Sequence, residues 1–114
     1  MGVQLEQKAE VAVLKLRGNF FGDRDTDKLR RTLRELTADG NLALAIDLGS
    51  VRRMNSIALG VLVGVHTNYV KRGGRVILAD LDRNIEDLLT ITKLARVFEI
   101  GPTLPDALRK LGAL

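Results

Sequence analysis

The stretch DLGSVRRMNSIALGVLVGV, residues 47–65, passes from the end of a strand into a helix that is apolar on most of its surface. The run LALAIDL at 42–48 is apolar and bounded by turn residues, which is typical of a strand buried on both faces. Asn55 or Ser56 is a good N-cap for the helix, and a Gly-Gly pair shortly after Lys71 is expected to end it. A doubly buried strand that leads directly into a helix indicates an α/β fold.

Strand and helix signals alternate through the rest of the chain. The alternation in VAVLKLRG predicts an N-terminal hairpin of strands at 3–8 and 11–17, closed by Gly18. A leucine stripe among charged residues predicts a helix that begins near Asp25 or Thr26. The later segments are predicted as a strand at 75–81, a helix at 84–92, a strand at 95–100 and a helix at 103–112.

The order of these elements is β-β-α-β-α-β-α-β-α. It predicts one α/β domain over residues 1–114, with a mixed central sheet flanked by about four helices. Right-handed crossovers between the parallel strands are expected to carry the helices. No internal repeat or linker interrupts this order, so a second domain is not expected.

Composition excludes several classes of function. The chain has no cysteine, which removes disulfides, thiolate catalysis and zinc–thiolate sites. Without an apolar run of about 18 residues or a secretory signal, we expect a cytoplasmic protein that is not inserted in a membrane. The net charge of +4 comes from 18 basic and 14 acidic residues, and aromatic residues are only 4% of the chain. Nucleic-acid-binding domains usually cluster basic residues among aromatics, so nucleic acid is not an expected partner.

The sequence shows no recognisable catalytic or metal site. The one histidine, His66, lies within the predicted helix and is expected at the surface or the edge of the core. Asp23, Asp25 and Asp27 are close together but lack the glycine turn and further oxygen ligands of a cation-binding loop. Acids at a helix start are explained by the helix dipole. We therefore expect no catalytic residues, no metal and no cofactor.

The helix at 56–71 carries more apolar residues than one sheet-facing stripe can hold. Four residues are assigned to the sheet-facing side: Leu59, Leu62, Val63 and Val70. Ile57 and Val61 then fall towards the side of the helix, and Ile57 and Ala58 are expected to be at least partly exposed. Exposed apolar residues rimmed by charge are a usual mark of an interaction site. The small pair Gly60 and Gly64 is expected to let the helix backbone approach the sheet closely.

The run AIDLGSVRRMNSIALGVLVGV resembles the STAS domain, the fold of bacterial anti-sigma-factor antagonists, whose pattern is close to D-L-S-x-V-x-x-x-D-S-S-G-L-G-V-L. The resemblance extends to LKLRG, KRGGRVILADL and LLTITKLARVFEIGPTLPDAL, and so covers nearly the whole chain. It implies a STAS fold and a bacterial regulatory protein that acts in signal transduction and transcription regulation through protein–protein interaction. The implied partner is an anti-sigma factor of the serine-kinase type.

In that family the second serine of D-S-S-G is phosphorylated by the kinase, and only the unmodified antagonist binds it. By resemblance, Asn55 stands at the aspartate, Ser56 at the first serine, Ile57 at the phosphoacceptor and Ala58 at the glycine. Ile57 has no hydroxyl and cannot be phosphorylated. The resemblance therefore implies a partner-binding surface around Asn55–Leu59. Its candidate residues are Asn55, Ser56, Ile57, Ala58 and Val61.

Three alternatives follow from the isoleucine. In the first, the protein binds its partner constitutively, with Ile57 and Ala58 in the interface. In the second, Ser56 is the phosphorylation site, although a capping serine would turn its oxygen towards its own backbone. In the third, the domain is a scaffold or accessory subunit of a sensory or transporter complex, since STAS domains also occur there.

Two further segments are of interest because family members also bind through the first helix and the loop before it. Arg24, Lys28 and Arg31 are candidate contacts there, although a solvated helix face explains them as well. In the loop GNFFGD, two phenylalanines replace the Leu-Asp pair of the family, and both are expected to be tucked under the domain. Asp23 stands in for the missing aspartate only if one residue has been inserted.

Overall fold

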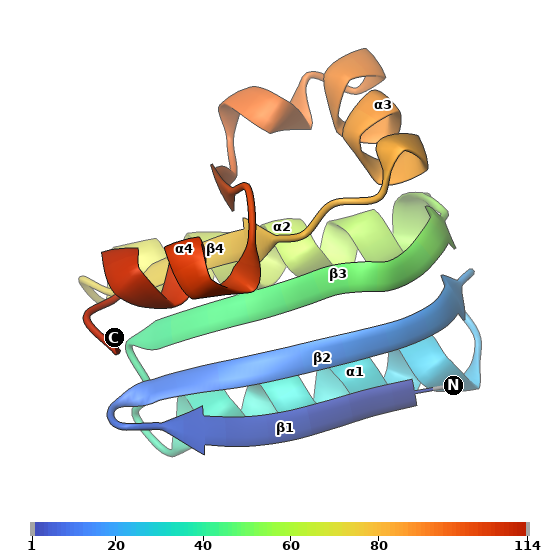
Figure 1. Ribbon diagram of the computed structural model, residues 1–114. Helices are drawn as coiled ribbons and strands as arrows, with labels where there is room; N and C mark the ends of the chain where they lie inside the picture. The colour runs from blue at the N-terminus through green and yellow to red at the C-terminus, as the bar shows by residue number, and fades with distance from the viewer. Residues whose placement is uncertain (1, 114) are drawn as a thin grey trace.

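The computed structural model describes residues 2–113, which form a five-stranded sheet with helices on both faces (Figure 1). The strands are β1 (Gly2–Lys8), β2 (Val11–Phe20), β3 (Ala43–Met54), β4 (Arg75–Ala79) and β5 (Glu99–Gly101). The helices are α1 (Arg24–Ala38), α2 (Ser56–Lys71), α3 (Arg83–Ile91) and α4 (Leu104–Lys110), with a 3-10 helix at Leu94–Arg96. The predicted order β-β-α-β-α-β-α-β-α is confirmed.

The sheet keeps the strands in their sequence order, β1-β2-β3-β4-β5. The β1–β2 hairpin is antiparallel, whereas β2, β3, β4 and β5 pair in parallel, so each parallel connection contains a helix. Strand β3 lies in the middle, and its residues Leu44, Ala45 and Ile46 are fully buried. The prediction of a central strand covered on both faces is therefore confirmed.

Alternate side chains of the strands supply two apolar layers. In β2, Leu14 faces α1 and α2 and belongs to the same core as Leu33 and Leu62. Its neighbour Val13 points to the opposite face, where it belongs to a smaller core with Leu108 of α4. In Figure 1, α4 lies in front of the sheet and α1 and α2 lie behind it.

The parallel pairing also determines where the loops meet. Strands β2, β3 and β4 run in the same direction, so their carboxyl ends lie along one edge of the sheet. The connections from these strands to α1, α2 and α3 therefore leave the sheet from the same side (Figure 1). Loops at this edge are the usual place for binding residues in an open α/β sheet.

Strand β2 extends further than predicted. Gly18 does not close it, because the strand continues to Phe20 and pairs with β3 as far as Met54. Gly18 has a φ of +100°, and the register shifts between Gly18 and Asn19. The glycine thus produces a bend within the strand, as glycines at bulges do.

The predicted strand at 95–100 is largely wrong. Lys93, with a φ of +64°, is followed by the 3-10 helix, and β5 begins only at Glu99. Strand β4 has five residues, and only its last three, 77–79, pair with β5. Residues 75 and 76 of β4 are left unpaired by β5, because the turn at Lys93 and the 3-10 helix occupy the segment that was predicted to be a strand.

The orientation of α2 also differs from expectation. Gly60 and Gly64 are exposed, and a Cβ added at either would meet nothing within 4 Å, so they do not provide a close approach to the sheet. Val70 is 54% exposed and does not face the sheet. The buried residues of α2 are Ala58, Leu59, Leu62, Val65 and Tyr69. Their spacing of three and four residues forms the buried stripe, and the glycines lie outside it.

Candidate protein-binding site

The start of α2 and the loop before α1 are held together at the carboxyl edge of the sheet. The backbone N–H of Asn55 donates to the carbonyl of Phe20 at 3.0 Å, which joins the end of β3 to the end of β2. In the β2–α1 loop, the N–H of Gly22 donates to the hydroxyl of Thr26 at 3.0 Å, and Thr26 is fully buried. These bonds give the two loops one defined arrangement.

Asn55 is the N-cap of α2, in agreement with the sequence. Its side-chain Oδ1 accepts hydrogen bonds from the N–H groups of Ile57 and Ala58, both at 3.1 Å. The backbone carbonyl of Asn55 accepts from the N–H of Leu59 at 3.0 Å, as the first bond of the helix. Ser56 is therefore the first helical residue and not the cap, and it is exposed. Because Asn55 performs the capping, the hydroxyl of Ser56 is not held by the cap and is not prevented from accepting a phosphate in that way.

Ile57 is 51% exposed, as expected from its place on the side of the helix. Its side chain lies on the backbone of Gly22, which has a φ of +82°. A Cβ at Gly22 would lie 2.7 Å from Cδ1 of Ile57 and 3.2 Å from its Cβ, so the loop passes this close only because residue 22 is glycine. The adjacent Phe21 is 46% exposed. Two large apolar side chains are thus presented to solvent on neighbouring segments.

Two other residues of the predicted surface are less accessible. Ala58 was expected to be partly exposed, but its side chain is fully buried, because it begins the stripe that faces the sheet. A partner cannot contact that methyl group without unfolding the start of α2. Val61 is half-buried and lines a groove between α1 and α2.

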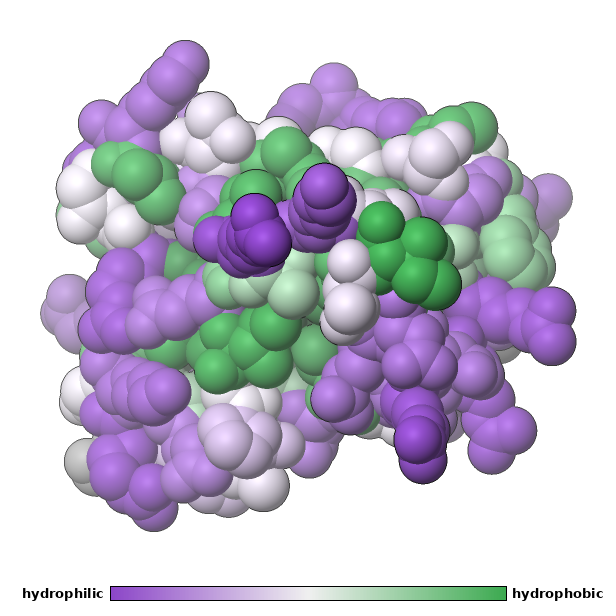
Figure 2. Space-filling model, turned by 90° about the horizontal axis from the view of Figure 1, so that it is seen from above, coloured by the Kyte–Doolittle hydropathy of each residue, from purple (hydrophilic) through white to green (hydrophobic). Residues whose placement is uncertain are grey.

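A hollow of about 370 Å³ lies beside the exposed phenylalanine. Its walls come from the β2–α1 loop, the end of β3 and helix α3, and they are formed by Phe21, Arg52, Arg53, Met54, Asn84 and Leu88. Both arginines are exposed, so the hollow combines an apolar surface with positive charge. Viewed from above Figure 1, the molecule has hydrophobic residues near the middle of the surface, with hydrophilic residues among and around them (Figure 2).

Phe21 is the member of this surface that sequence reasoning missed. Both phenylalanines of the loop were expected under the domain, yet only Phe20 is buried. Because β2 continues to Phe20, successive side chains point to opposite faces of the sheet, and Phe21 is directed outward. Period-two alternation would have indicated this if the strand had been extended past Gly18.

The cations of α1 lie where a solvated helix face places them. Arg24, Lys28 and Arg31 are all exposed. Asp23 is the N-cap of α1 and makes no side-chain capping bond, and it is also exposed. Nothing in these contacts assigns Asp23 the place of the aspartate that the loop lacks.

The described residues also bear on metal binding, membrane insertion and the surroundings of His66. Within residues 2–113, no three His, Cys, Asp or Glu side chains are grouped so that they could hold a metal ion. In the same span, no helix has the length and hydrophobicity needed to cross a membrane. His66 is half-buried, with its ring edge-on to that of Phe98 at a centroid distance of 5.6 Å. At the carboxyl edge of the sheet, the exposed Phe21 lies beside Arg52 and Arg53, and an exposed apolar surface rimmed by charge is a usual mark of an interaction site.

A model of the STAS domain matches residues 2–107 of the 114 in the chain. The chain belongs to the STAS domain family. This STAS domain is similar to a candidate anti-sigma factor antagonist from Thermotoga maritima, with 20% identity and a TM-score of 0.88 over 96% of this chain and 93% of the other. An anti-sigma factor antagonist from Mycobacterium paratuberculosis is 27% identical, with a TM-score of 0.80 over 96% and 92% of the two chains.

The Bacillus anti-sigma factor antagonist SpoIIAA, in its unphosphorylated form, is also similar in fold. It is 18% identical and has a TM-score of 0.77, and the match covers 99% of this chain and 100% of that one. The predicted STAS fold is thus confirmed over nearly its full length. Within this fold, the exposed Ile57 lies at the start of α2.

Proposed function

We propose that this STAS domain is a non-catalytic regulatory binding protein of the anti-sigma-factor-antagonist type. Its proposed partner is an anti-sigma factor of the serine-kinase class, bound through the start of α2 and the neighbouring loop. In this proposal the protein lacks phosphorylation at the usual position, because residue 57 is isoleucine.

The observation that carries the proposal is the exposure of Ile57. An isoleucine that is 51% exposed at a helix start does little for the core, whereas its burial by a partner is favourable. Complete burial of such a side chain contributes about 1.5–3 kcal/mol, so covering the exposed half adds roughly 1 kcal/mol to binding. Phe21 offers a second apolar surface of similar exposure.

The proposal is tested with Ile57→Glu and a matched control, Ile91→Glu. Ile91 is 79% exposed at the end of α3, so the control introduces the same charge in place of an exposed isoleucine elsewhere. Binding to purified kinase-type anti-sigma factors of the source organism is measured by calorimetry. We expect Ile57→Glu to weaken binding at least about tenfold, or about 1.4 kcal/mol, while the control binds like wild type.

Thermal denaturation of both variants accompanies the binding measurement. Both are expected to melt within a few degrees of wild type, because neither isoleucine is buried. Equal binding by wild type and Ile57→Glu would contradict the proposed surface. Absence of binding to every kinase-type factor would instead favour the function of a scaffold or accessory subunit.

The position of Ser56 favours a second candidate, a phosphorylation switch displaced by one residue. Ser56 is exposed at the first position of α2, and Asn55 performs the capping. A phosphate there would lie near the positive end of the helix dipole, which stabilises negative charge. The test is phosphate transfer from ATP by the same kinase-type factors. Incorporation that Ser56→Ala abolishes would support the switch, and no incorporation into wild type would exclude it for these kinases.

A further inference from the structure

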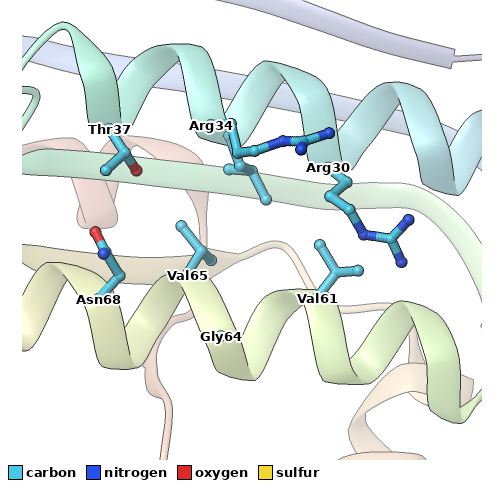
Figure 3. A pocket seen from close by; sticks show the side chains of 8 residues that line it. Arg30, Arg34, Thr37, Val61, Gly64, Val65 and Asn68 are labelled. Carbon is cyan, nitrogen blue, oxygen red and sulfur yellow. The ribbon is translucent and has the colours of Figure 1, made fainter.

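Helices α1 and α2 form a groove on the face of the sheet away from α4, which shares only Val61 with the predicted surface around Asn55–Leu59 (Figure 3). On α2 it is lined by positions 61, 64, 65 and 68, and on α1 by positions 30, 33, 34 and 37. Each helix thus contributes positions i, i+3, i+4 and i+7, which form one continuous face. The volume of the groove is about 320 Å³.

The floor of the groove is apolar. Leu33 from α1 and Val65 from α2 are 4% and 6% exposed, and they belong to the same core. Val61 is half-buried and packs against that core. In Figure 3, the side chains of Val61 and Val65 point from α2 towards α1. The groove therefore offers apolar surface that the core of the domain leaves partly uncovered.

Gly64 leaves one wall of the groove without a side chain. It is exposed, and a Cβ added there would meet nothing within 4 Å, so the fold itself does not require glycine. Glycine is among the least favourable residues in a helix interior. A glycine on the surface of a helix allows the backbone of another segment to approach closely.

The rim of the groove is positively charged. Arg30 and Arg34 project from α1 at the groove (Figure 3). Arg30 forms an ion pair with Asp27 at 3.0 Å, whereas Arg34 makes no ion pair with any residue in the described part of the chain. No acidic residue lines the groove, and the sequence of α2 contains neither Asp nor Glu.

We infer that this groove is a docking site for an acidic amphipathic helix of a partner protein. Its apolar residues would lie on Leu33, Val61 and Val65, its backbone would pass over Gly64, and its carboxylates would face Arg30 and Arg34. The eight-residue span of the groove on each helix matches about two turns of such a helix. Apolar surface bounded by arginines and free of acids favours this occupant over a basic one.

The inference is tested by NMR titration with a synthetic helical peptide of about four turns. The peptide has leucines at i, i+3, i+4 and i+7 and glutamates on both sides of this stripe. A second peptide has lysine in place of every glutamate. We expect the acidic peptide to shift the methyl signals of Leu33, Val61 and Val65, and to bind at least about tenfold more tightly than the lysine peptide.

Two matched variants separate the groove from the rest of α2. In Gly64→Leu the new side chain occupies the groove, so affinity for the acidic peptide should fall at least about tenfold while the melting temperature is maintained or raised. Gly60→Leu makes the same change at a glycine that is also exposed but does not line the groove, and this variant should bind the peptide like wild type. Arg34→Glu should weaken binding and reduce its dependence on salt.

Several results would overturn the inference. One is no shift of the groove methyl signals at about 1 mM peptide, the weak end of measurable affinity. Another is equal binding of the two peptides, which would remove the role of charge. Shifts confined to Ile57 would place the peptide on the surface of the proposed function. Groove signals that change with protein concentration alone would identify a second copy of this chain as the occupant.

Discussion

Replacement of Asn55 by alanine should measurably destabilise the protein. The change removes the acceptor for two backbone donors, the N–H groups of Ile57 and Ala58. Ile57 is half exposed, so water can replace its lost bond, whereas the side chain of Ala58 is fully buried. Loss of an N-cap costs about 1 kcal/mol, and a buried N–H without a partner costs about 1–3 kcal/mol. We therefore expect the free energy of unfolding to fall by about 2 kcal/mol.

Urea and thermal denaturation followed by circular dichroism measure this loss. For a domain of this size, about 2 kcal/mol corresponds to a fall of roughly 8 °C in the melting temperature. Asn55→Asp keeps the side-chain acceptor and adds a negative charge at the helix start, so its stability should equal or exceed that of wild type. Ser56→Ala alters an exposed neighbour outside the cap and should change stability by less than about 0.5 kcal/mol.

The comparison of these variants can refute the reasoning. If Asn55→Ala lost less than about 0.5 kcal/mol, the capping bonds would not contribute as the geometry requires. If Ser56→Ala lost more than Asn55→Ala, Ser56 would be the cap, and the case for Ser56 as a phosphorylation site would weaken.

Three further predictions concern residues of helix α2. Gly60→Ala and Gly64→Ala should each raise the free energy of unfolding by about 1 kcal/mol, since an added Cβ meets nothing within 4 Å. A lower free energy of unfolding in urea denaturation would contradict the exposure of this face. Leu62→Ala should lower it by about 2–5 kcal/mol, because Leu62 is 1% exposed in the main core; a change below 1 kcal/mol would be too small for a core residue. Burial raises the pKa of Tyr69, whose hydroxyl donates to Asn41 at 2.6 Å, so stability should fall as the pH rises above about 10, the ordinary tyrosine value. Tyr69→Phe loses that hydrogen bond but should show a flatter alkaline decline, and an unchanged decline would point to another group.

The proposed function gives the helix start a role different from that of a switchable antagonist. A serine at position 57 could carry a phosphate, whereas isoleucine offers a permanent apolar contact. Regulation would then depend on the amount of this protein, on Ser56, or on the groove between α1 and α2. Combining Ile57→Glu with Gly64→Leu would show whether the two surfaces bind partners independently, since distant sites usually contribute additively.

Local patterns were sufficient for most of the secondary structure. The apolar run at 42–48 predicted the central strand. Successive side chains of a strand point to opposite faces of the sheet, so a continuous apolar run is buried only when both faces are covered. Asn55 before an apolar helix indicated the cap, since its side chain can bond to the first free N–H groups. The exposure of Ile57 also followed from counting apolar residues around the helix. These are properties of neighbouring residues along the chain.

The predictions that were wrong concern which face of a helix or strand is buried against its neighbours. Helix α2 is apolar on most sides, so its pattern did not distinguish the buried face from the others. Packing against the sheet buries Ala58 and leaves Gly64 exposed, the reverse of what was expected for both. Strand β2 pairs with β3 beyond Gly18 as far as Phe20, which is buried, whereas the next residue, Phe21, is exposed. The sequence of β2 alone does not show how far β3 extends beside it.

The amino-acid pattern was thus enough to predict an α/β domain, and its resemblance to the STAS family directed attention to the start of α2. The groove beside Arg34 and the contact between Ile57 and Gly22 could be found only in three dimensions. Both are formed by segments that are distant in the sequence and are brought together by the parallel pairing of β2 with β3. The periodicity of apolar residues along one helix or strand predicts the type of that element. The exposure of its side chains depends on which other elements pack against it.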